Sequence, residues 1–148
     1  MIEVVNISKK YGSKHALSDV NVNIQKGEVV GLLGLNGAGK STTMNILTGY
    51  LSADCGYVTI GGHDIAEEPL KAKKLIGYLP EQFFFYNDMK VMEYLNFICD
   101  IKKVKQGRKE HIDDLCNRVG ISHIKTRMIK NLSKGYRQRV GFVQALLG

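Results

Sequence analysis

The feature that most constrains the fold of this chain is a glycine-rich loop at residues 34–41. Its sequence, Gly34-Leu35-Asn36-Gly37-Ala38-Gly39-Lys40-Ser41, is a complete G-x-x-x-x-G-K-[ST] pattern. The apolar residues 28–33 before it have the composition of a buried parallel strand, and residues 42–48 after it are compatible with the first turns of a helix. This order of strand, loop and helix predicts a nucleoside-triphosphate-binding site.

The residue types in the loop suit phosphate chemistry. Glycines let successive backbone N–H groups turn toward phosphate oxygens, and the helix N-terminus adds a partial positive charge. We expect Lys40 to reach the β- and γ-phosphates and the Ser41 hydroxyl to ligate Mg²⁺. The residues expected to bind nucleotide here are Gly34, Leu35, Asn36, Gly37, Ala38, Gly39, Lys40, Ser41 and Thr42.

Two other interpretations of the loop are disfavoured. A glycine-rich turn that merely joins a strand to a helix would not need the complete motif in this context. A dinucleotide-binding turn needs the order G-x-G-x-x-G, whereas Gly34, Gly37 and Gly39 fall as G-x-x-G-x-G before a lysine.

Length and composition predict one domain, either complete or incomplete. The 148 residues, 44% of them hydrophobic, suffice for one core and are too few for two ordinary domains. No stretch approaches the ~20 apolar residues that span a bilayer, and the N-terminus lacks a leader pattern, so we expect a cytoplasmic product. Cys55, Cys99 and Cys116 lack metal-ligand spacing and are expected to be reduced packing residues.

The net charge of +7 raises the question of an anionic partner. The basic clusters are Lys71, Lys73 and Lys74, and then Lys102, Lys103, Lys105, Arg108 and Lys109. No aromatic residues are interleaved with them in the way that single-stranded nucleic acid binding uses. We therefore favour a solvated surface, with contact to an anionic membrane as the weaker alternative.

Short patterns predict the remaining elements of the first half of the chain. Alternation favours strands in residues 1–8, 20–24 and 56–60, the first two in a half-exposed antiparallel sheet. Pro69 suits the first turn of a short helix through Leu75, and residues 76–80 are compatible with a strand that ends at a proline.

The second half of the chain has helical periodicity. One apolar stripe consists of Val91, Tyr94, Leu95, Ile98 and Ile101, and the next of Ile112, Leu115, Cys116 and Val119. These stripes predict two or three consecutive helices, broken at Gly107 and ended by Gly120. A final helix is predicted to begin near Ser133, a good N-cap, and to run to the end of the chain.

Residues 131–140, Asn-Leu-Ser-Lys-Gly-Tyr-Arg-Gln-Arg-Val, resemble the signature motif of ATP-binding-cassette (ABC) ATPases, L-S-G-G-Q-x-x-R. Together with the phosphate loop roughly 90 residues earlier, the resemblance covers the whole chain. It implies an α/β P-loop fold with an N-terminal antiparallel β-subdomain, a parallel-sheet core and an inserted helical subdomain. The nucleotide-binding core would span about 1–80, the helical subdomain about 88–130, and the signature motif with its helix 131–148.

The resemblance assigns further site residues. Tyr11 falls where the family places an aromatic side chain on adenine, although on its own it would be a packing residue at a strand end. Glu81 aligns with the glutamine of the family's glutamine loop and Gln82 follows it, so either could approach Mg²⁺ and the attacking water. The implied catalytic residues are Lys40, Glu81 and Gln82, and the implied metal ligands are Ser41, Glu81 and Gln82.

The signature departs from its common form at two positions. Ser133 and Gly135, which would touch the γ-phosphate held by the opposite subunit, are retained, whereas Lys134 replaces a glycine and Tyr136 a glutamine. Ser133 could also be a simple helix cap, and the two roles are compatible because a helix N-terminus suits an anion.

The resemblance also implies what the complete protein does. In the family an apolar strand with a metal-binding aspartate, a catalytic glutamate and a later histidine follow this helix, and none of them precedes Gly148. We therefore expect a fragment or a truncated reading frame that binds ATP and Mg²⁺ but does not hydrolyse ATP alone.

The implied full-length protein is the ATP-binding subunit of a transporter. It would pair head-to-tail with a second cassette and drive an integral membrane permease from the inner face of the cell membrane, with no nucleic acid partner. The alternatives are a non-hydrolysing nucleotide-binding module and a soluble cassette ATPase of DNA repair or translation. Substrate and direction of transport would belong to the permease.

Overall fold

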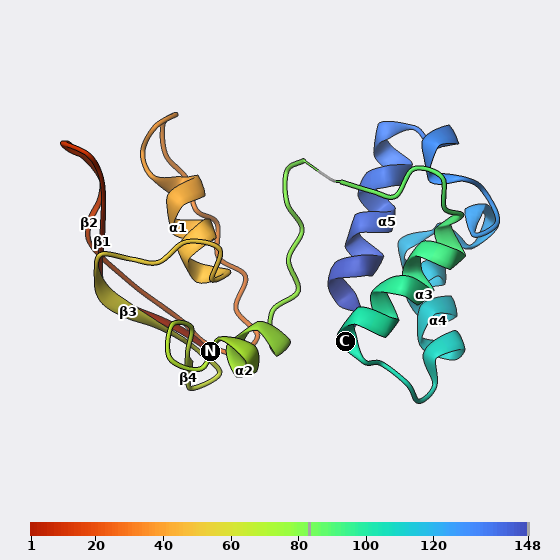
Figure 1. The fold of residues 1–148 in the computed structure, drawn as a ribbon, viewed down its shortest axis with the longest axis horizontal. Coiled ribbons are helices and arrows are strands. Elements are labelled where there is room, and N and C mark those ends of the chain that lie inside the picture. Colours follow the sequence, from red (N-terminus) through yellow and green to blue (C-terminus); the bar gives the residue numbers. More distant parts are fainter. Residues whose placement is uncertain (83, 148) are drawn as a thin grey trace. The chain divides into compact units, whose positions relative to one another are not determined.

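The computed structural model describes residues 1–82 and 84–147 as two compact units (Figure 1). We call Met1–Ile76 the N-terminal unit and Gly77–Gly148 the C-terminal unit. Each has its own cluster of buried apolar side chains. Within the described ranges, no helix combines the length and the apolar character needed to cross a membrane.

The N-terminal unit is built on an antiparallel sheet. Its strands are β1 (Ile2–Tyr11), β2 (Lys14–Ile24), β3 (Cys55–Ile60) and β4 (His63–Asp64), in the spatial order β2-β1-β3-β4. Helices α1 (Lys40–Leu47) and α2 (Pro69–Lys74) complete the unit. The core consists of Val4, Ile7, Leu17, Ile46, Val58, Ile60, Ile65 and Ala72. The predicted antiparallel β-subdomain and the helix after the loop are confirmed.

Two strand predictions are wrong in this structure. Residues 28–33 and 76–80 form no strand, and Val29 and Leu33 are 101% and 91% exposed. A buried parallel strand needs hydrogen-bonded neighbours, and every ladder between the strands of the described residues is antiparallel. The apolar composition of residues 28–33 suits a core strand, but these residues pair with no strand of the described part of the chain.

The C-terminal unit is helical, as the periodicity predicts. It contains α3 (Val91–Lys102), α4 (Arg108–Val119) and α5 (Lys134–Leu146), with the 3₁₀ turns η1 (Ser122–Ile124) and η2 (Ile129–Asn131) between the last two. Its fully buried side chains include Val91, Leu95, Cys99, Ile112, Cys116, Ile121, Ile124, Ile129, Val140 and Val143. Gly107 and Gly120 flank α4 in left-handed conformations, which confirms the predicted helix boundaries.

The three cysteines differ in their surroundings. Cys99 and Cys116 are buried, and burial raises the pKa of both thiols, so they are packing residues as predicted. Cys55, the first residue of β3, is exposed. The packing prediction was therefore wrong for Cys55, because the polar start of a strand carries no pattern that fixes which side chains are covered.

A buried tyrosine gives the C-terminal unit a predictable response to alkali. Tyr94 is 3% exposed and donates its hydroxyl to Gln144 Oε1 at 2.6 Å, and burial raises its pKa to about 12 from 10.0. The folded state therefore holds this proton more tightly than the unfolded chain does. The contribution of this group to the free energy of unfolding is fully present below about pH 10 and is lost as the pH rises to about 12.

We expect Tyr94→Phe to remove that alkaline loss. At neutral pH the variant should be less stable by about 1 kcal/mol, the worth of the lost hydrogen bond. Urea unfolding of both proteins between about pH 7 and pH 11 measures this. Equal decreases in stability above pH 10 in the two proteins would contradict the assignment to Tyr94.

Candidate nucleotide-binding site

Residues 34–41 curl into a turn that leads directly into α1. The Ala38 N–H donates to the Leu35 carbonyl at 3.1 Å, and Gly37 and Gly39 have left-handed φ angles of 84° and 88°. Gly39 is the N-cap residue of α1. Such alternation of conformations lets successive backbone N–H groups point to one side, which is the geometry that binds a phosphate.

The loop is fixed to the sheet at Gly39. A Cβ added there would lie 2.6 Å from the Ala16 carbonyl oxygen and 2.6 Å from Leu17 Cδ2, both in β2. Thr43 holds the same point from the helix side, because its buried hydroxyl donates to the Gly39 carbonyl at 3.1 Å. Thr43 was not foreseen as a supporting residue; its only sequence signal is a hydroxyl one turn beyond the glycine.

Lys40 folds back over the loop. Its Nζ donates to the Gly34 carbonyl at 2.7 Å and to the Leu35 carbonyl at 2.9 Å. The ammonium group thus already lies within reach of the loop backbone, while Ser41 is exposed on the first turn of α1. An ammonium group, a helix N-terminus and an exposed hydroxyl together suit a triphosphate with Mg²⁺.

Tyr11 is the last residue of β1, and its side chain is 52% exposed. Asp54 anchors this end of the strand by accepting from Lys9 Nζ at 2.6 Å and from the Lys10 N–H at 2.7 Å. The Lys9 and Lys10 hydrogen bonds lower the pKa of Asp54. An exposed ring on an anchored strand end is available for a base to stack on. Asp54 was missed because its partners lie more than 40 residues away in the sequence.

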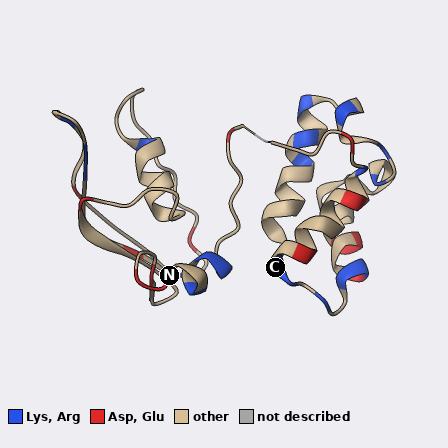
Figure 2. Ribbon diagram, in the orientation of Figure 1, with Lys and Arg blue, Asp and Glu red and all other residues tan. Residues whose placement is uncertain are grey.

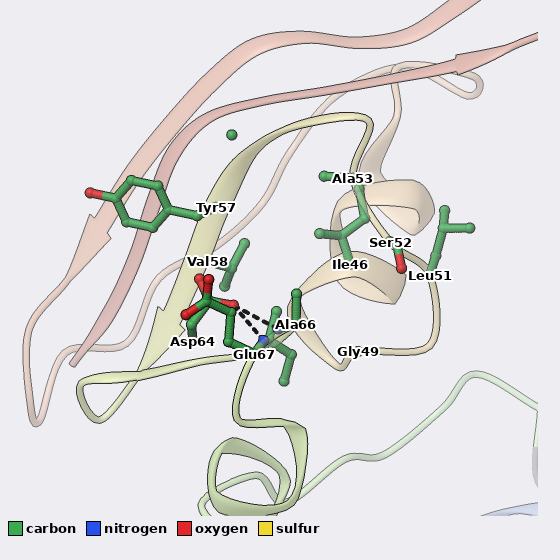
Figure 3. A pocket seen from close by; sticks show the side chains of 12 residues that line it. Ile46, Gly49, Leu51, Ser52, Ala53, Tyr57, Val58, Asp64, Ala66 and Glu67 are labelled. Atoms are coloured by element: carbon green, nitrogen blue, oxygen red, sulfur yellow. Dashed lines mark hydrogen bonds between the residues drawn. The ribbon is translucent and has the colours of Figure 1, made fainter.

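A second concavity in the N-terminal unit is unsuited to phosphate (Figure 3). This cavity of about 250 Å³ has an apolar wall that includes Ile46 and Val58, with Asp64 and Glu67 among its polar lining residues. Asp64 Oδ1 accepts from the Ala66 and Glu67 N–H groups at 2.7 and 3.1 Å. Its two carboxylates would repel a polyphosphate, so the loop is the candidate site.

The signature residues surround the start of α5. The Ser133 side chain caps the helix by accepting from the Tyr136 N–H at 3.4 Å, which confirms the predicted N-cap. Gly135 is exposed, and apart from its own helix backbone and chain neighbours no described residue has an atom within 4 Å of a Cβ built on it. The start of α5 therefore presents a hydroxyl and an open backbone to solvent.

Tyr136, the departure from the common signature, packs inward. Its ring lies edge-on to His123 with centroids 5.6 Å apart, and its hydroxyl lies 3.2 Å from His123 Nε2. The Arg139 guanidinium lies 5.9 Å from the ring centroid on its face. The tyrosine thus joins the signature helix to the preceding 3₁₀ turn, η1.

Glu81 and Gln82 are both exposed. They line a groove of about 770 Å³ together with Lys134 and Arg137, so the predicted glutamine loop and the signature meet there. Arg137 Nη2 donates to the Lys130 carbonyl at 3.0 Å, whereas its buried Nε has no hydrogen-bond partner among the described residues. These residues belong to the C-terminal unit, and the phosphate loop with Tyr11 belongs to the N-terminal unit.

Comparisons with known proteins agree with this geometry. Residues 17–148 match the sequence profile of the ABC transporter family. The lipopolysaccharide export system ATP-binding protein LptB of Haemophilus influenzae is 39% identical over 145 residues, which are 95% of this chain and 60% of that protein. The linearmycin resistance ATP-binding protein LnrL of Bacillus subtilis is 34% identical over 148 residues, which are 99% of this chain and 48% of that protein.

Solved structures are similar over almost the whole chain. An ATP-binding subunit of an ABC transporter superposes with a TM-score of 0.89 at 28% identity, covering 99% of this chain and 61% of that one. The ABC transporter cassette MJ0796, solved as a dimer, gives a TM-score of 0.86 at 27% identity, covering 99% and 69%. The chain spans about half to 60% of the length of the relatives named above. It belongs to the ABC transporter family, as an ATP-binding cassette.

Proposed function

We propose that this chain is the nucleotide-binding part of a transporter's ATP-binding subunit. The observation that carries the proposal is the phosphate loop itself, in which Lys40 Nζ reaches the loop backbone at the start of α1. Lys40 binds the β- and γ-phosphates, Ser41 ligates Mg²⁺, and the ring of Tyr11 stacks on adenine. The backbone of residues 34–39 and Thr42, in the first turn of α1, complete the phosphate-binding site.

The C-terminal unit supplies the residues that act on the γ-phosphate. Glu81 or Gln82 approaches the metal and the attacking water, and Ser133 with Gly135 contacts nucleotide held by a second cassette. That pairing is head-to-tail, and the MJ0796 cassette was itself solved as a dimer with ADP and phosphate. The complete subunit works with an integral membrane permease at the inner face of the cell membrane.

Nucleotide titration by calorimetry tests this function. The chain should bind ATP and ADP far more tightly than AMP, because the loop holds the β- and γ-phosphates, and EDTA should weaken ATP binding. Equal affinity for AMP and ATP would contradict the assignment of the loop. A soluble, non-transport cassette ATPase would bind the same nucleotides, so capture of a membrane permease by the full-length protein distinguishes the two functions.

Hydrolysis is a separate prediction. We expect the 148 residues alone to bind ATP without turnover, because in-line attack needs a positioned water and a complete metal site. Release of phosphate is measured with and without Mg²⁺. Steady turnover that Lys40→Ala abolishes would instead place a catalytic carboxylate within this stretch, and Glu81→Gln would be the variant to test first.

The adenine contact can be tested with two substitutions of one residue. Tyr11→Ala should weaken ATP and ADP binding equally, about five-fold, because one stacking contact worth about 1 kcal/mol is lost. Tyr11→Phe keeps the ring and should bind as the original chain does. Unaltered affinity in Tyr11→Ala would show that Tyr11 does not touch the base.

A further inference from the structure

The connection between α3 and α4 is the most basic stretch of the C-terminal unit. We call residues 102–109, Lys-Lys-Val-Lys-Gln-Gly-Arg-Lys, the basic loop. Figure 2 shows positive charge along this connection and the start of α4. With Asp100 and Glu110, the stretch from 100 to 110 still carries a net charge of +3. A local excess of positive charge needs counter-ions or an anionic binding partner.

Two of the five basic side chains in this loop have structural roles. Lys102 donates to the backbone carbonyls of Gln144 and Leu147 at the end of α5, and burial lowers its pKa. Arg108 donates to Asp100 at 2.6 Å and to the Val104 carbonyl at 3.0 Å. These contacts hold both ends of the basic loop in place.

The remaining three, Lys103, Lys105 and Lys109, are exposed. Among the residues that the structure describes, none of the three side chains has a hydrogen bond or an ion pair. Lys103 adopts a left-handed φ of 60°, so the turn begins directly at the end of α3. Ile101, two residues before Lys103, is apolar and 61% exposed. Three exposed lysines therefore lie within eight residues of an exposed aliphatic side chain in the sequence.

We propose that the basic loop binds the surface of an anionic lipid membrane. Lysine ammonium groups attract acidic headgroups without a fixed geometry, and an adjacent aliphatic side chain can enter the interface. Nucleic acid fits less well, because the one arginine is engaged by Asp100 and the loop has no aromatic ring for a base. The proposal does not depend on nucleotide binding, because the basic loop contains none of the residues proposed to bind nucleotide.

Vesicle flotation tests this with phosphatidylcholine vesicles and with vesicles that also contain about 30% phosphatidylserine. The chain should float with the anionic vesicles at about 0.1 M salt and be released at about 0.5 M. Combined Lys103→Gln, Lys105→Gln and Lys109→Gln should weaken this binding on the order of 100-fold, at about five-fold for each lysine. Ile101→Ser should weaken it a few-fold.

The matched control removes the same charge elsewhere. Lys14→Gln, Lys26→Gln and Lys74→Gln change three exposed lysines of the N-terminal unit that have no ion pair with described residues. This control and Lys40→Ala should both bind vesicles as the original chain does. Equal losses in the two triple variants, equal binding to neutral vesicles, or tighter lysine-dependent binding to a single-stranded oligonucleotide would each overturn the proposal.

Discussion

Lys40→Ala should lower the affinity for ATP by roughly 10- to 100-fold. The lost interaction is a charge-assisted hydrogen bond to phosphate, worth about 1.5–3 kcal/mol. The fold should persist, because Lys40 is only half-buried and, among the described residues, its Nζ bonds only to the carbonyls of Gly34 and Leu35. Calorimetric titration with ATP measures the affinity, and circular dichroism checks the fold.

A matched lysine separates the loop's chemistry from the chain's net charge. Lys26 is exposed in the turn after β2, and no described residue forms an ion pair with it. Lys26→Ala removes the same charge and should leave ATP affinity within about two-fold of the original. ATP binding that is unchanged in Lys40→Ala, or equally weakened in both variants, would contradict the role assigned to Lys40.

The parts of the site that could be predicted are those encoded by neighbouring residues. The phosphate loop and α1 follow from one continuous motif, because Gly39 is the N-cap of the helix and Lys40 bonds the loop carbonyls five and six residues before it. The cap of α5 is equally local, since Ser133 bonds an N–H only three residues away. The helices of the C-terminal unit were predictable because apolar residues at helical spacing form one stripe, and burying that single stripe against any neighbouring element is enough to stabilise the helix.

Contacts between distant residues could not be predicted. Asp54 anchors the strand that carries Tyr11, yet nothing in the sequence near Asp54 identifies Lys9 as its partner. The edge-on contact of Tyr136 with His123 likewise depends on how η1 meets α5. In residues 28–33 the local pattern gave a wrong prediction for the same reason. Their composition suits a buried strand, but a strand forms only where another strand pairs with it. Propensity describes a segment, whereas burial depends on what packs against it.

Gly39→Ala should strongly destabilise the N-terminal unit. The new Cβ would lie 2.6 Å from the Ala16 carbonyl oxygen and from Leu17 Cδ2, at a φ of 88° that side chains rarely adopt. Either β2 or the start of α1 must move, at a cost on the order of 3–5 kcal/mol. Because Gly39 is the N-cap of α1, the same movement should displace the phosphate-binding backbone and remove measurable ATP binding.

Gly37→Ala is the control that isolates this contact. Gly37 has nearly the same φ, 84°, but no described residue beyond its two chain neighbours has an atom within 4 Å of a Cβ built there. It should therefore cost only about 1 kcal/mol, the conformational penalty alone. Urea unfolding and ATP titration of both variants provide the comparison. If the two alanines are equally destabilising, left-handed backbone strain explains the glycines. If only Gly39→Ala unfolds the unit, the contact of Gly39 with β2 is what holds the phosphate loop in place.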